Sequence, residues 1–347
     1  MVDNKKKLLM IGMDFHTYEN EIVKCLIDLG FNVKKVTDKP HKKRGYDTFT
    51  PESKKKKDQI AHQFKLLKDL NDSYDVVLVF VGRFIQRFFL EGIKKKNPNA
   101  KMILYLWDDL ARVENFDQVK DLYDEIITFE LNDSIKYGYR FVPLYYMPQF
   151  KTTLCDKKYD VCTISSNHSD RIELMRKIIA SSPNNWRFNF IVVVSLASYV
   201  KYFFSKYRKS DKKGGLCFTI KPKTIEETAK IMSESKAILD LQHFTQKGLT
   251  NRTLESLGSG IKLITSNEQV KYYDFYKPNN IFVIDRKNPT IDDSFLETPY
   301  EGVPNKIYNE YSLENWLRAI LFKDKYIYLN NDIESISKSI AKGEKND

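Results

Sequence analysis

The sequence predicts an α/β chain folded into two doubly wound domains, each built on a parallel sheet. In the first part of the chain, short apolar runs alternate with segments of helical spacing. Two prolines and an aromatic cluster break this alternation across Phe141–Lys151, and the same alternation then resumes. Continuous apolar strands separated by helices are typical of parallel sheets that are covered on both faces.

The first domain is expected over residues 1–150. Its opening strand, Lys7–Met13, precedes a helix, Glu19–Leu29, which Gly30 ends. Residues 39–58 are polar and basic, which favours a long surface loop. The remaining strands are Phe31–Val36, Tyr74–Val81, Lys101–Trp107 and Glu125–Phe129, and the remaining helices are Gln59–Leu70, Arg83–Lys95 and Phe116–Leu122. Because crossovers between parallel strands are right-handed, the series predicts a Rossmann-like sheet.

The second domain is expected over residues 151–310. Residues 311–347 should form a C-terminal helix and a polar, frayed tail that packs back toward the first domain. The predicted strands are Tyr159–Ile164, Arg187–Val194, Leu216–Ile220, Ala237–Leu241, Ile261–Thr265 and Ile281–Ile284. The predicted helices are Arg171–Ile179, Leu196–Tyr207, Ile225–Ser233, Asn251–Leu257 and Leu313–Phe322. The two Rossmann-like halves are expected to face a cleft.

Length and composition bound the protein class. The chain has 347 residues, 42% hydrophobic and 30% charged, which suits two packed domains and excludes disorder. Its four cysteines have irregular spacing without a C-x-x-C pair, so they indicate neither a zinc site nor a disulfide framework. Neither the first apolar run nor Phe188–Val200 suits a signal peptide or a bilayer span. We expect a cytoplasmic protein, either soluble or peripheral on the inner face of the cell membrane.

The formal net charge is +11, and the basic excess falls in the first two-thirds of the chain. Part of it lies in runs, among them Lys54–Lys57 and Lys206–Lys213. Such runs usually form solvated faces, although basic runs beside aromatic residues also suit an anionic membrane. Because the runs are scattered and no nucleic-acid motif accompanies them, nucleic acid is not an expected partner. A basic, non-catalytic nucleic-acid-binding protein is kept as the least favoured alternative.

The segment His243–Asn267 carries the strongest functional signal. It lies between two predicted strands, where ligands of open α/β sheets bind. Gly248 permits a tight turn, and Thr250 or Asn251 can cap the helix that follows. The start of that helix offers free N–H groups and partial positive charge to a diphosphate.

Two charged residues of the same helix have proposed roles. Arg252 supplies a cation for phosphate, and Glu255 can accept hydrogen bonds from a sugar or ribose hydroxyl. The alternative is that Arg252 and Glu255 only satisfy the end of the helix. Further candidate donor contacts in this segment are His243, Gln246, Leu249 and Thr253.

A second polar loop, Ser165–Arg171, follows the first strand of the second half. Ser165, Ser166 and Asn167 can cradle phosphate, and Arg171 can pair with it. The alternative is an ordinary helix cap made by Ser169 or Asn167. Lys221, which follows a strand predicted to end near the nucleotide base, is a further candidate contact.

Acids and a histidine of the first half are candidate catalytic residues. Asp14 and His16 follow the first strand, and Asp108 and Asp109 follow the fourth. Asp108, Asp14 or His16 could act as a general base that deprotonates an acceptor hydroxyl. Alternatively, Asp108 and Asp109 form a helix cap or a salt bridge with Arg112, and two adjacent acids could also bind a metal. Gly12 is not part of a G-x-G-x-x-G motif, which disfavours a dinucleotide oxidoreductase.

Several stretches resemble bacterial GT-B glycosyltransferases that build capsules and lipopolysaccharide O-antigens. Lys236–Asp240 with Gln246–Glu255 is similar to the donor loop and helix of that family, and Gly258–Asn267 is similar to the turn and strand that follow. The resemblance also covers Tyr105–Arg112, Phe141–Tyr146, Asn279–Asp285 and Tyr311–Ile320. Many retaining members place two glutamates eight positions apart. Glu255 matches the second, but Lys247 stands at the first, so a retaining mechanism is not carried over.

The resemblance implies a glycosyltransferase that moves a sugar from a nucleotide-sugar donor to a glycan or lipid-linked acceptor in surface polysaccharide biosynthesis. It implies a donor site in the second domain, an acceptor site in the first, no cofactor and no catalytic metal. Other GT-B chemistry, namely sugar-nucleotide epimerisation or polyol-phosphate transfer, is the close alternative.

Overall fold

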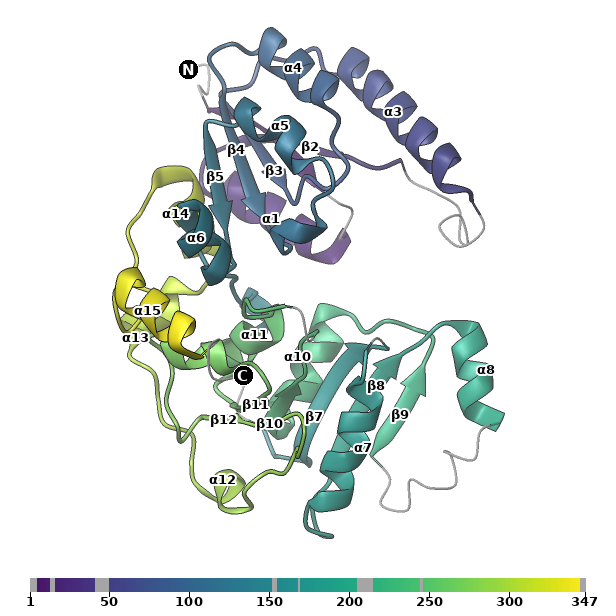
Figure 1. The fold of residues 1–347 in the computed structure, drawn as a ribbon, viewed down its shortest axis with the longest axis vertical. Coiled ribbons are helices and arrows are strands. Elements are labelled where there is room, and N and C mark those ends of the chain that lie inside the picture. Colours follow the sequence, from purple (N-terminus) through teal and green to yellow (C-terminus); the bar gives the residue numbers. More distant parts are fainter. Residues whose placement is uncertain are drawn as a thin grey trace. The chain divides into compact units, whose positions relative to one another are not determined.

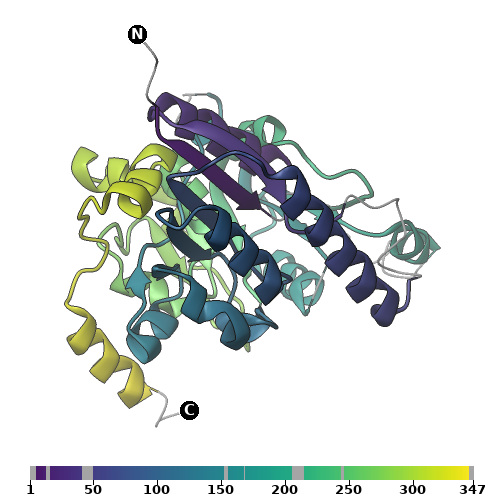
Figure 2. The same cartoon turned by 90° about the horizontal axis from the view of Figure 1, so that it is seen from above.

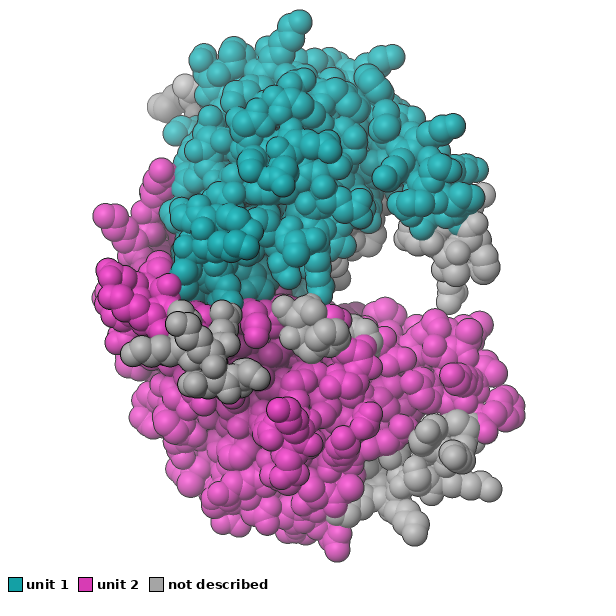
Figure 3. Space-filling view, in the orientation of Figure 1, with its two compact units in different colours: residues 1–142 teal, residues 143–347 magenta. Residues whose placement is uncertain are grey.

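The computed structural model describes residues 5–12, 16–40, 50–151, 155–167, 169–204, 215–243 and 246–343. The chain divides into two compact units, residues 1–142 and residues 143–347 (Figure 3). Each unit contains a six-stranded sheet whose neighbouring strands are parallel, with helices packed on it. The predicted α/β class with two Rossmann-like, doubly wound domains is therefore confirmed.

The sheet of the first unit has the strand order β2-β1-β3-β4-β5-β6. Its strands are β1 (Lys7–Gly12), β2 (Asn32–Thr37), β3 (Val76–Phe80), β4 (Lys101–Leu106), β5 (Glu125–Thr128) and β6 (Arg140–Phe141). The helices are α1 (His16–Asp28), α3 (Glu52–Asp69), α4 (Arg87–Lys96), α5 (Phe116–Val119) and α6 (Leu131–Tyr137). Chain connections diverge between the adjacent strands β1 and β3, which makes this pair the topological switch point of the sheet.

The core of the first unit follows the alternation of side chains along its strands. Leu9 and Ile11 of β1 belong to one apolar cluster together with Phe89 and Ile93 of α4. Helices α3, α4 and α5 cover that face, and α1 lies on the other (Figures 1 and 2). Because successive strand residues point to opposite faces, a nearly continuous apolar run is what a sheet covered on both faces requires.

The sheet of the second unit has the order β12-β11-β10-β7-β8-β9. Its strands are β7 (Tyr159–Ser166), β8 (Phe188–Val193), β9 (Leu216–Thr219), β10 (Ser235–Asp240), β11 (Lys262–Thr265) and β12 (Ile281–Val283). The main helices are α7 (Arg171–Ser181), α8 (Leu196–Phe204), α10 (Ile225–Ser233), α11 (Asn251–Ser259), α12 (Ser294–Glu297), α13 (Asn305–Glu310), α14 (Leu313–Phe322) and α15 (Ile333–Gly343). None of the helices in the described residues combines the length and hydrophobicity needed to cross a membrane.

The aromatic segment that follows the first unit joins the C-terminal helices. Tyr146 donates its backbone N–H to the carbonyl of Tyr311 over 2.9 Å, and its own carbonyl accepts from Leu313 over 3.2 Å. The ring of Tyr145 packs on Trp316 with a centroid distance of 4.2 Å. This stretch therefore belongs to the second unit, through contacts between residues far apart in the sequence.

Three helices that differ from the sequence prediction are α3, α4 and α15, and other elements, among them α6, β6 and α13, were not predicted. Helix α3 begins at Glu52, inside the predicted loop 39–58, because a lysine run is compatible with an exposed helical face. Helix α4 begins at Arg87 instead of Arg83, and left-handed backbone at Val81 and Gly82 lies before the predicted start. The polar tail was expected to fray, but Ile333–Gly343 forms helix α15.

Candidate functional site

The second sheet has its topological switch point between β7 and β10, which are neighbours although the strands β8 and β9 and several helices lie between them in sequence. Ligands of open α/β sheets bind outside the carboxyl ends of the strands at such a point. β7 ends at Ser166 and β10 ends at Asp240. The two polar loops that the sequence singles out therefore begin on adjacent strands at one edge of the sheet.

Asp240 anchors the first turn of α11. Thr250 is the N-cap of this helix, and its hydroxyl oxygen accepts from the backbone N–H of Arg252 over 3.1 Å. The hydroxyl of Thr250 donates to Asp240 Oδ2 over 2.7 Å, and that of Thr253 donates to the same atom over 2.9 Å. With Leu249 buried beside it, the start of α11 is held at the end of β10. The helix end thus lies where an anion can reach its N–H groups.

Arg252 and Glu255 contact each other. Arg252 Nη1 lies 2.7 Å from Glu255 Oε2, and Arg252 Nη2 donates to the carbonyl of Ile164 in β7 over 2.7 Å. The carboxylate is buried, so the arginine neutralises it and also ties α11 to β7. This pairing corresponds to the helix-end alternative, and the proposed phosphate and sugar roles of the two side chains stay predictions.

Two further arginines belong to the same edge. Arg171 Nε donates to the carbonyl of Leu241 over 2.5 Å, just beyond β10. Arg286, which the sequence analysis missed, donates from Nη1 to Ser266 Oγ over 2.8 Å, and its Nη2 pairs with Asp170. Its position in the sequence could have indicated it, because Arg286 stands three residues after the end of a strand, β12, and ligands bind beyond the carboxyl ends of strands.

The charged groups at this edge include the three arginines and three carboxylates, Asp240, Asp170 and Glu255. Burial lowers the pKa of Arg171, and repulsion from Arg252 and Arg286 lowers it further, while Asp240 and Asp170 oppose the change. Guanidinium groups close enough to repel one another are stabilised when an anion binds among them. We call Arg171, Arg252 and Arg286 the arginine cluster.

Among the described residues, the N-cap position of α7 is occupied by Asp170, which makes no side-chain capping bond. The alternative of a helix cap made by Ser169 or Asn167 is therefore not supported. The hydroxyl of Ser165 is buried without a hydrogen-bond partner among the described residues. Ser166 accepts from Arg171 through its carbonyl, and Asn167 Nδ2 lies 3.4 Å from the hydroxyl of Tyr202.

The other residues predicted to contact the sugar donor lie outside the arginine cluster. The backbone N–H of Gln246 donates to the carbonyl of His243, and the turn at Gly248 is held by Asn267, whose Nδ2 donates to the Lys247 and Gly248 carbonyls. Asn267 had no assigned role in the sequence analysis. Lys221 follows the edge strand β9, two strands away from β7, and within the described part of the chain no hydrogen bond or ion pair joins it to the arginine cluster.

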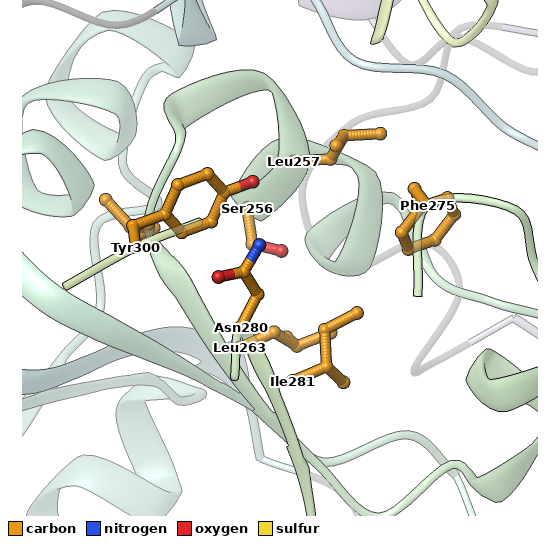
Figure 4. Close-up of a pocket in the computed structure, with 8 residues that line it drawn as sticks. Ser256, Leu257, Leu263, Phe275, Asn280, Ile281 and Tyr300 are labelled. Carbon is orange, nitrogen blue, oxygen red and sulfur yellow. The ribbon is translucent and has the colours of Figure 1, made fainter. Parts of the chain in front are cut away.

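A small pocket lies elsewhere in the second unit, lined by Ser256, Leu257, Ile261, Leu263, Phe275, Asn280, Ile281 and Tyr300 (Figure 4). Its free volume is about 10 Å³, which holds roughly one water molecule. It is bounded by the end of α11 and the beginnings of β11 and β12. It therefore lies toward the opposite edge of the sheet from the arginine cluster and does not suit a nucleotide.

In the first unit, Asp108 is the predicted base whose surroundings are described. Arg83 Nη2 donates to Asp108 Oδ2 over 2.5 Å, and Asp109 caps the next turn by accepting from Ala111. Burial raises the pKa of Asp108, although the positive charges of Arg83 and Arg112 lower it in part. A carboxylate with a raised pKa is a stronger base.

The other two predicted catalytic residues follow β1. Asp14 lies outside the described residues, and His16 is described by its backbone alone, as the first residue of α1. The structure therefore places Asp108 and His16 at the carboxyl ends of β4 and β1, which β3 separates in the sheet.

No protein-family model matches the chain, and no curated protein matches its sequence significantly. Solved structures do match. A glycosyltransferase from Rickettsia africae has 12% identity and a TM-score of 0.58, with 92% of this chain and 98% of that chain covered.

Two other structures match over nearly the whole chain. The catalytic domain of starch synthase IV from Arabidopsis thaliana, bound to ADP and acarbose, has 9% identity, a TM-score of 0.55 and 98% coverage of both chains. The UDP-N-acetylglucosamine 2-epimerase from Rickettsia bellii has 11% identity and a TM-score of 0.54, with 92% of this chain and 100% of that chain covered. Together with the two parallel sheets, these likenesses show that the chain has the GT-B fold of paired Rossmann-like domains.

Proposed function

We propose that the protein is a glycosyltransferase that takes its sugar from a nucleoside-diphosphate donor. The observation that carries the proposal is the arginine cluster beside the start of α11, at the switch point of the second sheet. Several cations and a helix N-terminus at one strand edge suit the two phosphates of such a donor. In this proposal the buried hydroxyl of Ser165 donates to a phosphate oxygen.

The proposed reaction is a displacement at the anomeric carbon. The acceptor hydroxyl oxygen forms a bond to that carbon, and the bond from the carbon to the diphosphate oxygen breaks. The nucleoside diphosphate leaves with the bonding electrons, and the arginine cluster and α11 stabilise its developing charge. Positive charge is thus available from protein groups, and we propose that no metal or cofactor takes part.

The acceptor proton has to go to a base. We propose Asp108, at the carboxyl edge of the first sheet, because it combines partial burial with a raised pKa. Proton removal by a positioned carboxylate typically contributes 10²–10⁴-fold to a rate. In this proposal the first unit binds the acceptor and the second unit binds the donor.

We further propose that the acceptor is a glycan or a lipid-linked glycan of surface polysaccharide biosynthesis, reached from the cytoplasmic face of an anionic membrane. Helix α8 supports the membrane part. Its exposed apolar side chains Leu196, Val200 and Phe204 are 57, 46 and 80% accessible, at the spacing of one helical face. The net charge of +11 would add attraction to anionic lipid. Sedimentation with phosphatidylglycerol vesicles, but not with phosphatidylcholine vesicles, is the expected result for the intact chain.

The decisive experiment combines ligand binding with product analysis. UDP, GDP, CDP, TDP and CMP are screened by thermal shift, and the matching nucleotide sugars are then incubated with and without glycan acceptors. Release of nucleoside diphosphate that depends on an acceptor supports transfer. Conversion of the donor sugar to an isomer without any acceptor would point to epimerisation, and no stabilisation by any nucleotide would remove the proposal.

A further inference from the structure

Helix α3 of the first unit carries exposed apolar side chains. Ile60 is 37% exposed and Phe64 is 51% exposed, and because they stand four positions apart they are neighbours on one face of the helix. Phe88 of α4 packs on the apolar core of the unit, and the ring of Phe64 stacks on it with a centroid distance of 4.2 Å and an interplanar angle of 18°. Single exposed apolar residues are common, whereas a contiguous apolar patch is typical of a binding surface.

The helices α3 and α4 lie side by side (Figure 1). Gly92 of α4 allows the close approach, because a Cβ at that position would overlap the side chain of Leu67 in α3. At the end of α4, Lys96 Nζ donates over 2.8 Å to the carbonyl of Leu70, the C-cap of α3, where a positive charge suits the helix end. The apolar patch therefore rests on two helices whose contact is fixed by packing and by a hydrogen bond.

Lysines border this apolar patch. Lys57 stands three positions before Ile60, which places both on one face of α3. Lys68 stands four positions after Phe64 and continues the same stripe at its other end. Lys95 of α4 stands seven positions after the ring on which Phe64 stacks, so it lies on the same helix face as that ring. The patch thus has a lysine at each end and another on the neighbouring helix.

The charge of these lysines is not neutralised by an ion pair. Lys57, Lys68 and Lys95 are exposed and form no ion pair within the residues that the structure describes. By contrast, the adjacent Lys94 has a partner in Asp124 over 3.9 Å. Unpaired lysines of this kind are available to an external anion.

Acidic side chains of the two helices do not lie in the stripe. Asp58 and Asp69 each follow one of its lysines by one position, which turns them about 100° around α3. Glu91 of α4 is paired with Arg87 over 2.7 Å. The exposed apolar side chains are therefore accompanied by net positive charge.

We propose that this surface docks the first unit on an anionic lipid bilayer. We call it the α3–α4 surface, and it consists of Lys57, Ile60, Phe64, Lys68, Phe88 and Lys95. The apolar side chains enter the boundary between headgroups and acyl chains, while the lysine ammonium groups extend to the lipid phosphates. The inference rests on the proposed function, in which the first unit binds an acceptor at a membrane, and it names the part of that unit that meets the lipid.

The composition of the α3–α4 surface favours lipid over a protein partner. Arginine is enriched and lysine depleted at protein–protein interfaces, yet the three cations of this surface are all lysines. A lysine carries a point charge on a flexible stem, which suits mobile headgroups better than a fixed, planar partner. Helix α8 belongs to the other unit, so substitutions test the two surfaces separately.

The first experiment measures insertion directly. Phe64→Trp places a fluorophore at an exposed position in the middle of the stripe, and the wild type, with its three native tryptophans, is the reference. With phosphatidylglycerol vesicles, the emission of the new tryptophan should shift to the blue, and brominated acyl chains should quench it. Phosphatidylcholine vesicles should leave the emission unchanged. A new tryptophan that phosphatidylglycerol vesicles neither shift nor quench would overturn the inference and favour a protein as the occupant of the surface.

The second experiment measures the contribution of the lysines. In Lys57→Gln/Lys68→Gln/Lys95→Gln, the affinity of the intact chain for phosphatidylglycerol vesicles in sedimentation should fall by about a hundredfold, because each lysine near an anionic lipid surface contributes about fivefold. Circular dichroism and an unchanged melting temperature show that the variant is folded, as exposed positions lead us to expect.

A matched control removes the same charge elsewhere. Lys24→Gln/Lys34→Gln/Lys271→Gln changes three exposed lysines outside the α3–α4 surface and should bind the vesicles nearly as well as the wild type. If the two triple variants bind alike, the inference is overturned, even if transfer from a nucleotide sugar is observed. If no nucleotide sugar is turned over but the α3–α4 variant alone loses the vesicles, the docking surface stands and the proposed function fails.

Discussion

The contact between Arg252 and Glu255 allows a quantitative test of what holds the candidate donor site. Glu255 has a side chain that is 3% exposed, and Arg252, at 21%, is its ion-pair partner over 2.7 Å. Arg252→Met leaves this carboxylate buried without its cation. Removing one partner of a buried ion pair costs about 3–5 kcal/mol, and the partial exposure of Arg252 favours the lower end. For a unit of this size we expect the melting temperature to fall by about 6–12 °C.

The double variant Arg252→Met/Glu255→Met should be more stable than the single variant. It removes the uncompensated charge and loses mainly the hydrogen bond from Arg252 to Ile164, worth about 1 kcal/mol. Differential scanning calorimetry of the wild type, both single variants and the double variant gives the coupling energy. Lys177→Met is the control, because its pair with Glu173 is 50% and 68% exposed and should contribute below about 0.5 kcal/mol.

The same variants separate the two interpretations of Arg252. If Arg252 binds phosphate, the single and double variants both lose affinity for the nucleoside diphosphate in isothermal titration calorimetry. If Arg252 only satisfies the helix end, the double variant binds like the wild type. A double variant as unstable as Arg252→Met would refute the reasoning about the ion pair.

Three further predictions concern the second unit. Arg286→Gln should weaken nucleoside-diphosphate binding about tenfold in isothermal titration calorimetry, because a charge-assisted hydrogen bond contributes roughly 1.5–3 kcal/mol. An unchanged affinity would exclude Arg286 from the site. Gly258→Ala should lower the free energy of unfolding by about 1–3 kcal/mol in chemical denaturation, although alanine favours helices. The reason is that the new Cβ would lie 2.7 Å from the buried ring of Tyr146. A more stable variant would contradict this packing. Burial raises the pKa of Asp274 to about 6, so its contribution to stability is present below about pH 4 and lost as the pH rises through 6. Asp274→Asn, which can still accept from Tyr311, should therefore melt higher than the wild type at pH 8 and not at pH 4, and an equal difference at both pH values would argue against this titration.

The α/β class and most strands follow from local sequence patterns. The run from Val76 to Val81 is apolar without interruption, as a strand buried on both faces has to be, and it contains β3. The start of α11 is equally local, because a threonine hydroxyl can accept from the N–H groups of the next residues wherever a helix begins. Such features depend on neighbours in sequence, so they can be predicted without the fold.

The features that the sequence did not predict correctly have physical causes. The lysine run 54–57 looked like a loop because it has no apolar periodicity, yet an exposed helical face needs none. Tyr146 pairs with the segment at Ser312, and no local pattern could indicate that partner.

The candidate site divides in the same way. By itself, the sequence determined the α/β class, the capped start of α11 and the polar loops after β7 and β10, because these depend on spacing within single elements. Only the tertiary structure decided that β7 and β10 are adjacent, that Arg286 joins Arg171 and Arg252, and that Arg83 pairs with Asp108. Those facts depend on strand order and on side chains from distant segments, and the free energy that selects a strand order comes from burial over the whole sheet rather than from any local pattern.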